Sequence, residues 1–157
     1  MASAVTTVKL FANAAILSYD HDPGATSAVI TSPDGGTTKR VVAMENYGGF
    51  AVTSMTSVSA SSSGVTKLEI VGCTDSSGSN PTVIVDSGTV AADAVGDFVA
   101  VECTAEQVKE VGDAGGLTLT HIAGRLTCSN SGDEAVVTYI RHTPRYPQSG
   151  LTANAIS

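Results

Sequence analysis

The stretch DEAVVTYIRHTPRY, Asp133 to Tyr146, holds the densest run of positive charge in an acidic chain. Arg141, His142 and Arg145 belong to residue types that line catalytic pockets, hold phosphate, or pair with carboxylates of a partner. Which of these roles applies depends on the groups that the rest of the chain can bring to them.

The alternation within EAVVTYIRH predicts a strand whose two faces differ. Val137, Tyr139 and Arg141 share one face, and His142 lies on the other face with the residues between them. Pro144 and Pro147 follow directly, and proline removes a backbone donor, so the strand is expected to end there.

The preceding segment, LTLTHIAGRLTC, is also predicted as a strand, and SNSGD has the composition of a tight reversal between the two. We therefore expect the strands to be neighbours, with His121 and Arg125 near Arg141 if they pair. Two interpretations of this basic cluster stay open. One is a contact with a carboxylate-rich partner through Arg141, His142, Arg145 and Tyr146; the other is ordinary solvated side chains with an internal ion pair of small value.

Two other groups of residues invite a chemical interpretation. The segment YDHDP, Tyr19 to Pro23, has two Asp around one His, but three or four converging ligands make a metal site and no motif supplies the others. A strand end that runs into an Asp-Pro turn is the favoured interpretation. Cys103 is a nucleophile candidate with His121 or His142, yet its alternation with Val99 and Val101 predicts a buried structural thiol.

Motifs for other catalytic or nucleotide chemistry do not appear in the sequence. There is no G-x-S-x-G elbow, and SPDGGTTKR is a hairpin signal that lacks the phosphate-loop pattern and a following helix. The expectation is a protein that is not an enzyme, with no catalytic residue, no metal and no cofactor.

The composition limits the kinds of partner that the chain is expected to bind. The chain has 157 residues, a formal net charge of −7 and eight Lys plus Arg, which argues against a general role in binding nucleic acid. No apolar run approaches the length needed to span a bilayer, and no signal peptide is visible, so synthesis in a host cytoplasm is expected. Three widely spaced cysteines, Cys73, Cys103 and Cys128, predict reduced and buried thiols.

Short strand-like runs between turn signals fill almost the whole length, and only 4% of residues are aromatic. GVTKLEIVGC is the clearest run, because Leu68 and Ile70 share a face opposite Lys67 and Glu69. One short helix, about 105–111, is predicted after a Thr104/Gln107 capping box. We expect an all-β fold, a β-sandwich or jelly-roll-like single domain over 1–143, and an extended C-terminal arm over 144–157.

Two blocks, VTKLEIVGCTDSSGSNPTVIVDSGTVAADAVGDFVAVECTAEQV and AGRLTCSNSGDEAVVTYIRHTPRY, resemble the small β-rich virion proteins of tailed bacteriophages, of the capsid decoration or cement type. The resemblance covers roughly residues 65–146 and lies in the order of strands, helix and basic end. It implies a β-sandwich or jelly roll that binds the outside of a shell of major capsid protein as an oligomer and strengthens it.

The function expected from the sequence is thus that of a structural virion protein on the capsid surface, with the major capsid protein and other copies of itself as partners, and with no nucleic acid or membrane. Another phage structural part, such as a tail or head–tail joining protein, is an alternative. So is a carbohydrate or host-surface binding module, for which Tyr47 and Tyr146 are the ring-stacking candidates.

Overall fold

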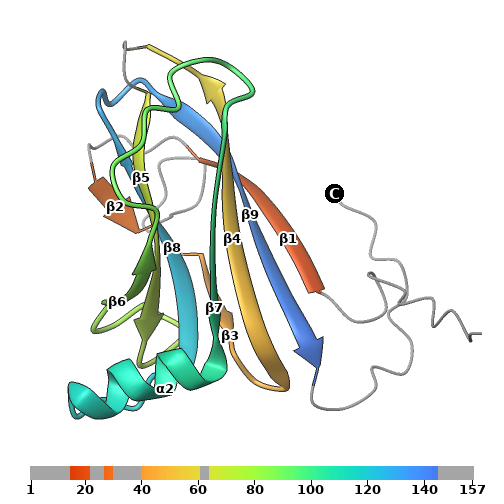
Figure 1. Ribbon diagram of the computed structural model, residues 1–157, viewed down its shortest axis with the longest axis vertical. Helices are drawn as coiled ribbons and strands as arrows, with labels where there is room; N and C mark the ends of the chain where they lie inside the picture. Colours follow the sequence, from red (N-terminus) through yellow and green to blue (C-terminus); the bar gives the residue numbers. More distant parts are fainter. Residues whose placement is uncertain (1–14, 22–26, 30–39, 61–63, 145–157) are drawn as a thin grey trace, which may run out of the picture.

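The computed structural model describes residues 15–21, 27–29, 40–60 and 64–144, with side chains from residue 40 onward (Figure 1). Two antiparallel sheets face each other across one core. The first, sheet A, has the order β1-β9-β4-β7, and the second, sheet B, has the order β2-β8-β5-β6, with β3 also paired to β8. The strands are β1 (Ala15–His21), β2 (Ser27–Val29), β3 (Val41–Ala43), β4 (Tyr47–Val58), β5 (Val65–Cys73), β6 (Thr82–Asp86), β7 (Phe98–Thr104), β8 (His121–Cys128) and β9 (Glu134–Pro144).

The strands pair as one long hairpin rolled up on itself. Strand β1 pairs with β9, β2 and β3 pair with β8, β4 pairs with β7, and β5 pairs with β6. Rolling then sets β4 beside β9 and β5 beside β8. This pairing gives a double-sheet jelly roll. The expectation of an all-β, β-sandwich or jelly-roll-like fold is confirmed.

The core lies between the sheets and is filled by side chains from both. Alternation sets one face of each strand inward, as the period of two requires. The largest fully buried side chains of this core are Tyr139, Phe50, Leu68, Ile70, Ile122, Leu126, Val52, Val65 and Val108. Val71 is buried in a separate small cluster with Cys73 and Ala123. Leu68 and Ile70 share a buried face, as predicted, and the shared face predicted for Val137 and Tyr139 is the buried face of β9.

One helix in the described residues, α2 (Ala105–Ala114), begins directly after β7 and lies across one end of the sandwich (Figure 1). The predicted capping box is confirmed. The Gln107 amide donates to the Thr104 hydroxyl at 3.2 Å, and the Thr104 amide donates to the Gln107 side chain at 2.9 Å. The helix runs to Ala114 instead of ending near 111. Gly112 is buried within it, and the left-handed backbone comes only at Gly116, with a φ of 65°.

The expectation that the strands now named β8 and β9 are neighbours was wrong, since they lie in opposite sheets. The hairpin predicted at SPDGGTTKR and the C-terminal arm beyond Pro144 lie outside the described residues. Within those residues, no helix is long and apolar enough to cross a membrane.

Candidate functional site

His142 lies near the C-terminal end of β9, and its side chain reaches across sheet A. Its Nε2 is 3.2 Å from the Glu102 carboxylate on β7, although β4 lies between these two strands. Gly49 is the β4 residue in register with His142. A Cβ at position 49 would lie 2.1 Å from Cε1 of the imidazole, so the ring lies where a side chain would otherwise stand. Gly49 therefore makes the His142–Glu102 contact possible.

Arg141, the neighbouring residue, points to the other face and is held within the chain. Its guanidinium lies 4.8 Å from the centre of the Tyr47 ring, and its Nη1 donates to the Ala43 carbonyl at 3.1 Å. These contacts tie the end of β9 to the β3–β4 connection. The structure thus separates Arg141 from His142. Arg145 and Tyr146 lie outside the described residues, and partner contact by these four residues stays a prediction.

The expected approach of His121 and Arg125 to Arg141 was wrong, because β8 belongs to sheet B. Arg125 instead donates from Nε to the Glu69 carboxylate at 2.5 Å, and Lys67 Nζ lies 3.1 Å from the same carboxylate. The Glu69 side chain is only 3% exposed. Its hydrogen bond with Arg125 lowers the pKa of Glu69, against the opposing effect of burial. This cluster is a structural ion pair on the outer face of sheet B.

The cysteines are buried thiols, as expected. Burial, assisted by the nearby Glu102, raises the pKa of Cys103 to about 12. Burial also raises the pKa of Cys128 to about 11. Both groups are held in the thiol form, which is a poor nucleophile.

Metal-binding groups do not gather in the part of the chain that is described: no cluster of three or more His, Cys, Asp or Glu side chains there could hold an ion. Asp20 and His21 of the YDHDP segment lie on β1, whereas Asp22 and Pro23 fall outside the described residues.

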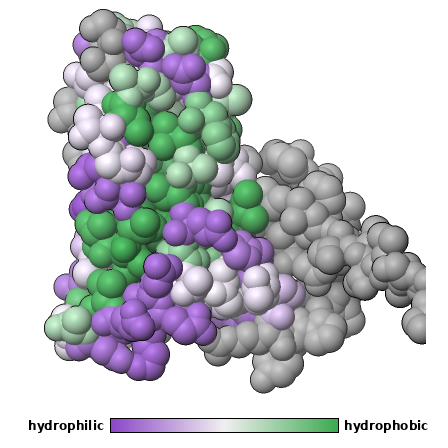
Figure 2. Space-filling view, in the orientation of Figure 1, coloured by the Kyte–Doolittle hydropathy of each residue, from purple (hydrophilic) through white to green (hydrophobic). Residues whose placement is uncertain are grey.

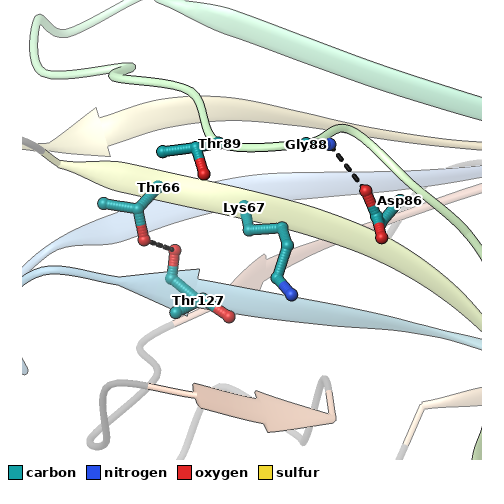
Figure 3. Close-up of a pocket in the computed structure, with 6 residues that line it drawn as sticks. All are labelled: Thr66, Lys67, Asp86, Gly88, Thr89 and Thr127. Carbon is teal, nitrogen blue, oxygen red and sulfur yellow. Dashed lines mark hydrogen bonds between the residues drawn. The ribbon is translucent and has the colours of Figure 1, made fainter.

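A shallow polar pocket of about 350 Å³ opens beside β5 (Figure 3). Its lining residues are Thr66, Lys67, Asp86, Gly88, Thr89 and Thr127. The polar groups largely bind one another. Thr66 donates to the Thr127 carbonyl at 3.1 Å, the Gly88 amide donates to Asp86 at 2.7 Å, and Lys67 pairs with Glu69. The pocket therefore presents few unused groups to a ligand.

Apolar side chains are exposed at the end of the sandwich where β4 finishes and β7 begins. We call this set the apolar end patch: Met55, Val58, Val95 and Phe98, which are 44%, 41%, 72% and 63% exposed. Met55 and Phe98 are directly opposite each other in the β4–β7 register. Backbone bonds between Thr56 and the 96–97 turn hold the two chain segments together beyond the strands. The two segments that carry these four exposed side chains are thus joined at this end.

The apolar end patch was not predicted from the sequence, although a signal for it exists. Once Val99, Val101 and Cys103 are assigned to the buried face of β7, the same alternation sets Phe98 and Ala100 on the outward face. Exposed aromatic and aliphatic side chains that adjoin one another mark interaction surfaces.

Comparison with known proteins does not assign this chain to a family. No family model matches the chain, and no curated protein matches it. Among solved structures, the PRD1 vertex protein P5 is 12% identical, with a TM-score of 0.45, over 84% of this chain and 98% of that one. A structure of the infectious bursal disease virus Gt strain is 13% identical, with a TM-score of 0.38, over 88% of this chain and 33% of that one.

A third structure, of T=1 particles derived from infectious bursal virus, is 13% identical, with a TM-score of 0.37, over 87% of this chain and 31% of that one. The chain thus spans about a third of the two bursal virus chains. All three are viral proteins, but similarity at this level assigns neither family nor function to the chain.

Proposed function

We propose that the chain is a structural protein of a virus particle, a decoration (cement) protein that binds the outer surface of a phage head and stabilises it. The proposed partners are the major capsid protein and neighbouring copies of the chain. The observation that carries the proposal is a filled jelly roll with an apolar end patch: such a protein acts through its outer surfaces.

The filled space between the two sheets favours a structural role over the other functions that jelly rolls serve. Viral capsid domains, lectins and cupins share the architecture, and the fold alone does not separate them. Between the sheets of this chain, large apolar side chains such as Phe50, Leu68 and Ile122 are completely buried. A ligand pocket inside the sandwich would need that space.

A carbohydrate-binding role has less support. Sugar rings stack on exposed aromatic faces, and Tyr47, one of the two candidates for this contact, is 7% exposed and covered by Arg141. Tyr139 and Phe50 are buried as well. Phe98 is exposed, but its neighbours in the apolar end patch are aliphatic or sulfur-containing and lack the hydroxyl and amide groups that sugars require.

The apolar end patch suits attachment to a large protein shell. Figure 2 shows apolar residues in green along much of the visible face, and hydrophilic ones in purple both at the upper end and near α2 at the lower end. Many copies that each bury a modest apolar area against a shell hold it together by the sum of their contacts. The predicted contact residues Arg141, His142, Arg145 and Tyr146 would contact acidic groups separately from the patch, because Arg141 and His142 pair near the start of β4, at the other end of that strand from Met55.

The test is reconstitution on phage heads that lack the chain. Purified wild-type protein is expected to bind to saturation and to raise the temperature at which heads break open. Val95→Glu, which sets a charge in the apolar end patch, is expected to weaken binding at least about tenfold. Thr118→Glu adds the same charge to an exposed position near α2 and should bind like wild type. Absence of wild-type binding would refute the proposal, and equal binding of both variants would refute the role of the patch.

A further inference from the structure

Strand β7 has a free edge. It is the last strand of sheet A and pairs with β4 along one side, from Phe98 opposite Met55 to Thr104 opposite Gly49. In the described part of the chain, no strand pairs with its other side. Backbone N–H and C=O groups along such an edge are a template for another extended strand.

This edge also lacks the usual protection. Proteins commonly guard exposed edges with lysine, proline or a bulge. The sequence of β7 is FVAVECT, without lysine or proline, and its register with β4 is regular throughout. Its outward side chains include Phe98, Ala100 and Glu102, and the one charge among them already pairs with His142 at 3.2 Å.

The space beside the edge is open, and small or apolar residues line it together with Ser87 and Asp97. A groove of about 440 Å³ runs between β7 and the connection from β6, with Val90, Ala91 and Ala92 on one side and residues 98–100 on the other. The small side chains leave room for a second strand to approach. Strand β7 runs along this face in Figure 1, where Figure 2 shows the band of apolar residues.

We propose that the occupant is a second copy of the chain. The two β7 strands pair antiparallel about a two-fold axis at Ala100, which joins two four-stranded A sheets into one. A two-fold contact uses the same surface on both subunits, and an antiparallel strand pair has that symmetry. The inference deepens the proposed function, since it names the surface by which neighbouring copies meet.

Repulsion between the two Glu102 side chains distinguishes the possible registers of the paired β7 strands. An axis through any residue keeps opposed side chains on the same face, and axes at Ala100, Val101 and Glu102 pair most of the residues of β7. At about 3.4 Å per residue, an axis at Ala100 keeps the two Glu102 side chains roughly 14 Å apart, beyond the Debye length at physiological salt. An axis at Val101 brings them to about 7 Å, and one at Glu102 sets them face to face. Repulsion between the two Glu102 side chains is therefore weakest in the Ala100 register, which is favoured.

The test uses charge complementation at the axis. Wild-type protein at physiological salt is expected to form a dimer in sedimentation velocity as concentration rises. Ala100→Lys and Ala100→Glu each set like charges opposite each other, and each should weaken self-association about tenfold. A one-to-one mixture of the two variants sets Lys opposite Glu and should recover the dimer.

Two controls sharpen the result. Val83→Lys adds the same charge to β6, the edge of sheet B, and should dimerise like wild type. Ala100→Cys should form a covalent dimer on mild oxidation, because opposed strand positions lie within disulfide reach. A wild-type monomer at all concentrations, or no recovery in the mixture, would overturn the inference. Head binding by a monomer would leave the proposed function standing, so the two failures are distinguishable.

Discussion

The hydroxyl of Tyr139 on β9 accepts a 2.7 Å hydrogen bond from the backbone amide of Gly124 on β8, and this bond joins the two sheets across the core. The same hydroxyl donates to the Arg40 carbonyl at 3.0 Å. Gly124 lies between Ala123, which pairs with β3, and Arg125, which pairs with β2. Tyr139 therefore fills the place where β8 changes its partner strand.

Removal of this hydroxyl is expected to destabilise the fold. Tyr139→Phe leaves the buried Gly124 amide without its acceptor, which should lower the free energy of unfolding by about 1–3 kcal/mol. Urea denaturation at pH 7 measures the change. Thr53→Val, which removes a hydroxyl from the outward face of β4, is the matched control and should stay within about 0.5 kcal/mol of wild type. Equal stability of Tyr139→Phe and wild type would contradict the inter-sheet role.

The Glu69 ion pair makes part of the stability depend on pH. Arg125 lowers the pKa of Glu69 in the folded state, so folding favours the charged carboxylate. The resulting stabilisation is fully present above the ordinary pKa of a glutamate. It is lost as pH falls through the lowered pKa of the folded state.

Glu69→Gln should remove this dependence. The difference in unfolding free energy between wild type and Glu69→Gln is expected to be largest at pH 7 and to shrink steadily below about pH 4.5. Urea unfolding at several pH values between 7 and 3 measures it. Glu110→Gln, on the exposed face of α2, controls for the loss of one negative charge. A difference that grows as pH falls would contradict a lowered pKa of Glu69 in the folded state.

The space over Gly49 predicts a coupling with His142. Gly49→Ala should push the imidazole away and break its contact with Glu102, at a cost of up to about 1 kcal/mol. In a His142→Ala background, the same change should be neutral or stabilising, since alanine favours a strand more than glycine does. A double-mutant cycle by urea unfolding measures the coupling. Purely additive effects would show that the His142 imidazole does not depend on the space over Gly49.

The cysteines should be unreactive in the folded protein. An ordinary thiol is about a quarter ionised at pH 8, whereas a pKa of about 12 leaves roughly one Cys103 in ten thousand ionised. We expect no reaction with a disulfide reagent such as DTNB in native protein and three reactive thiols in guanidinium. Rapid modification of Cys103 without unfolding would contradict its burial.

Local patterns in the sequence predicted local structure well. The Leu68/Ile70 alternation and the Thr104/Gln107 capping box depend on neighbours in the chain, and both are confirmed. The end of α2 was misplaced because Gly112 looks like a stop signal. Gly112 is instead buried close to Leu119, a tertiary contact that the local pattern does not report.

Sheet membership could not be predicted in the same way. The SNSGD loop looks like a hairpin turn, yet it connects the two sheets. Its Asp133 is completely buried and accepts hydrogen bonds from the amides of Ala60 and Asn130. The Ala60 contact spans 73 residues of sequence, and no local pattern reports it. The separation of Arg141 from Arg125 follows from that crossing.

The most direct test of a structural role in the virion is the composition of the particle itself. The proposed function requires the chain to be present in the virions of a phage. Quantitative mass spectrometry of virions purified, at constant buoyant density, from cultures that produce the chain measures the copies of the chain for each major capsid protein. A decoration protein is expected at a fixed ratio that survives repeated purification. Recovery of the chain only from the soluble fraction of the lysate would contradict this role.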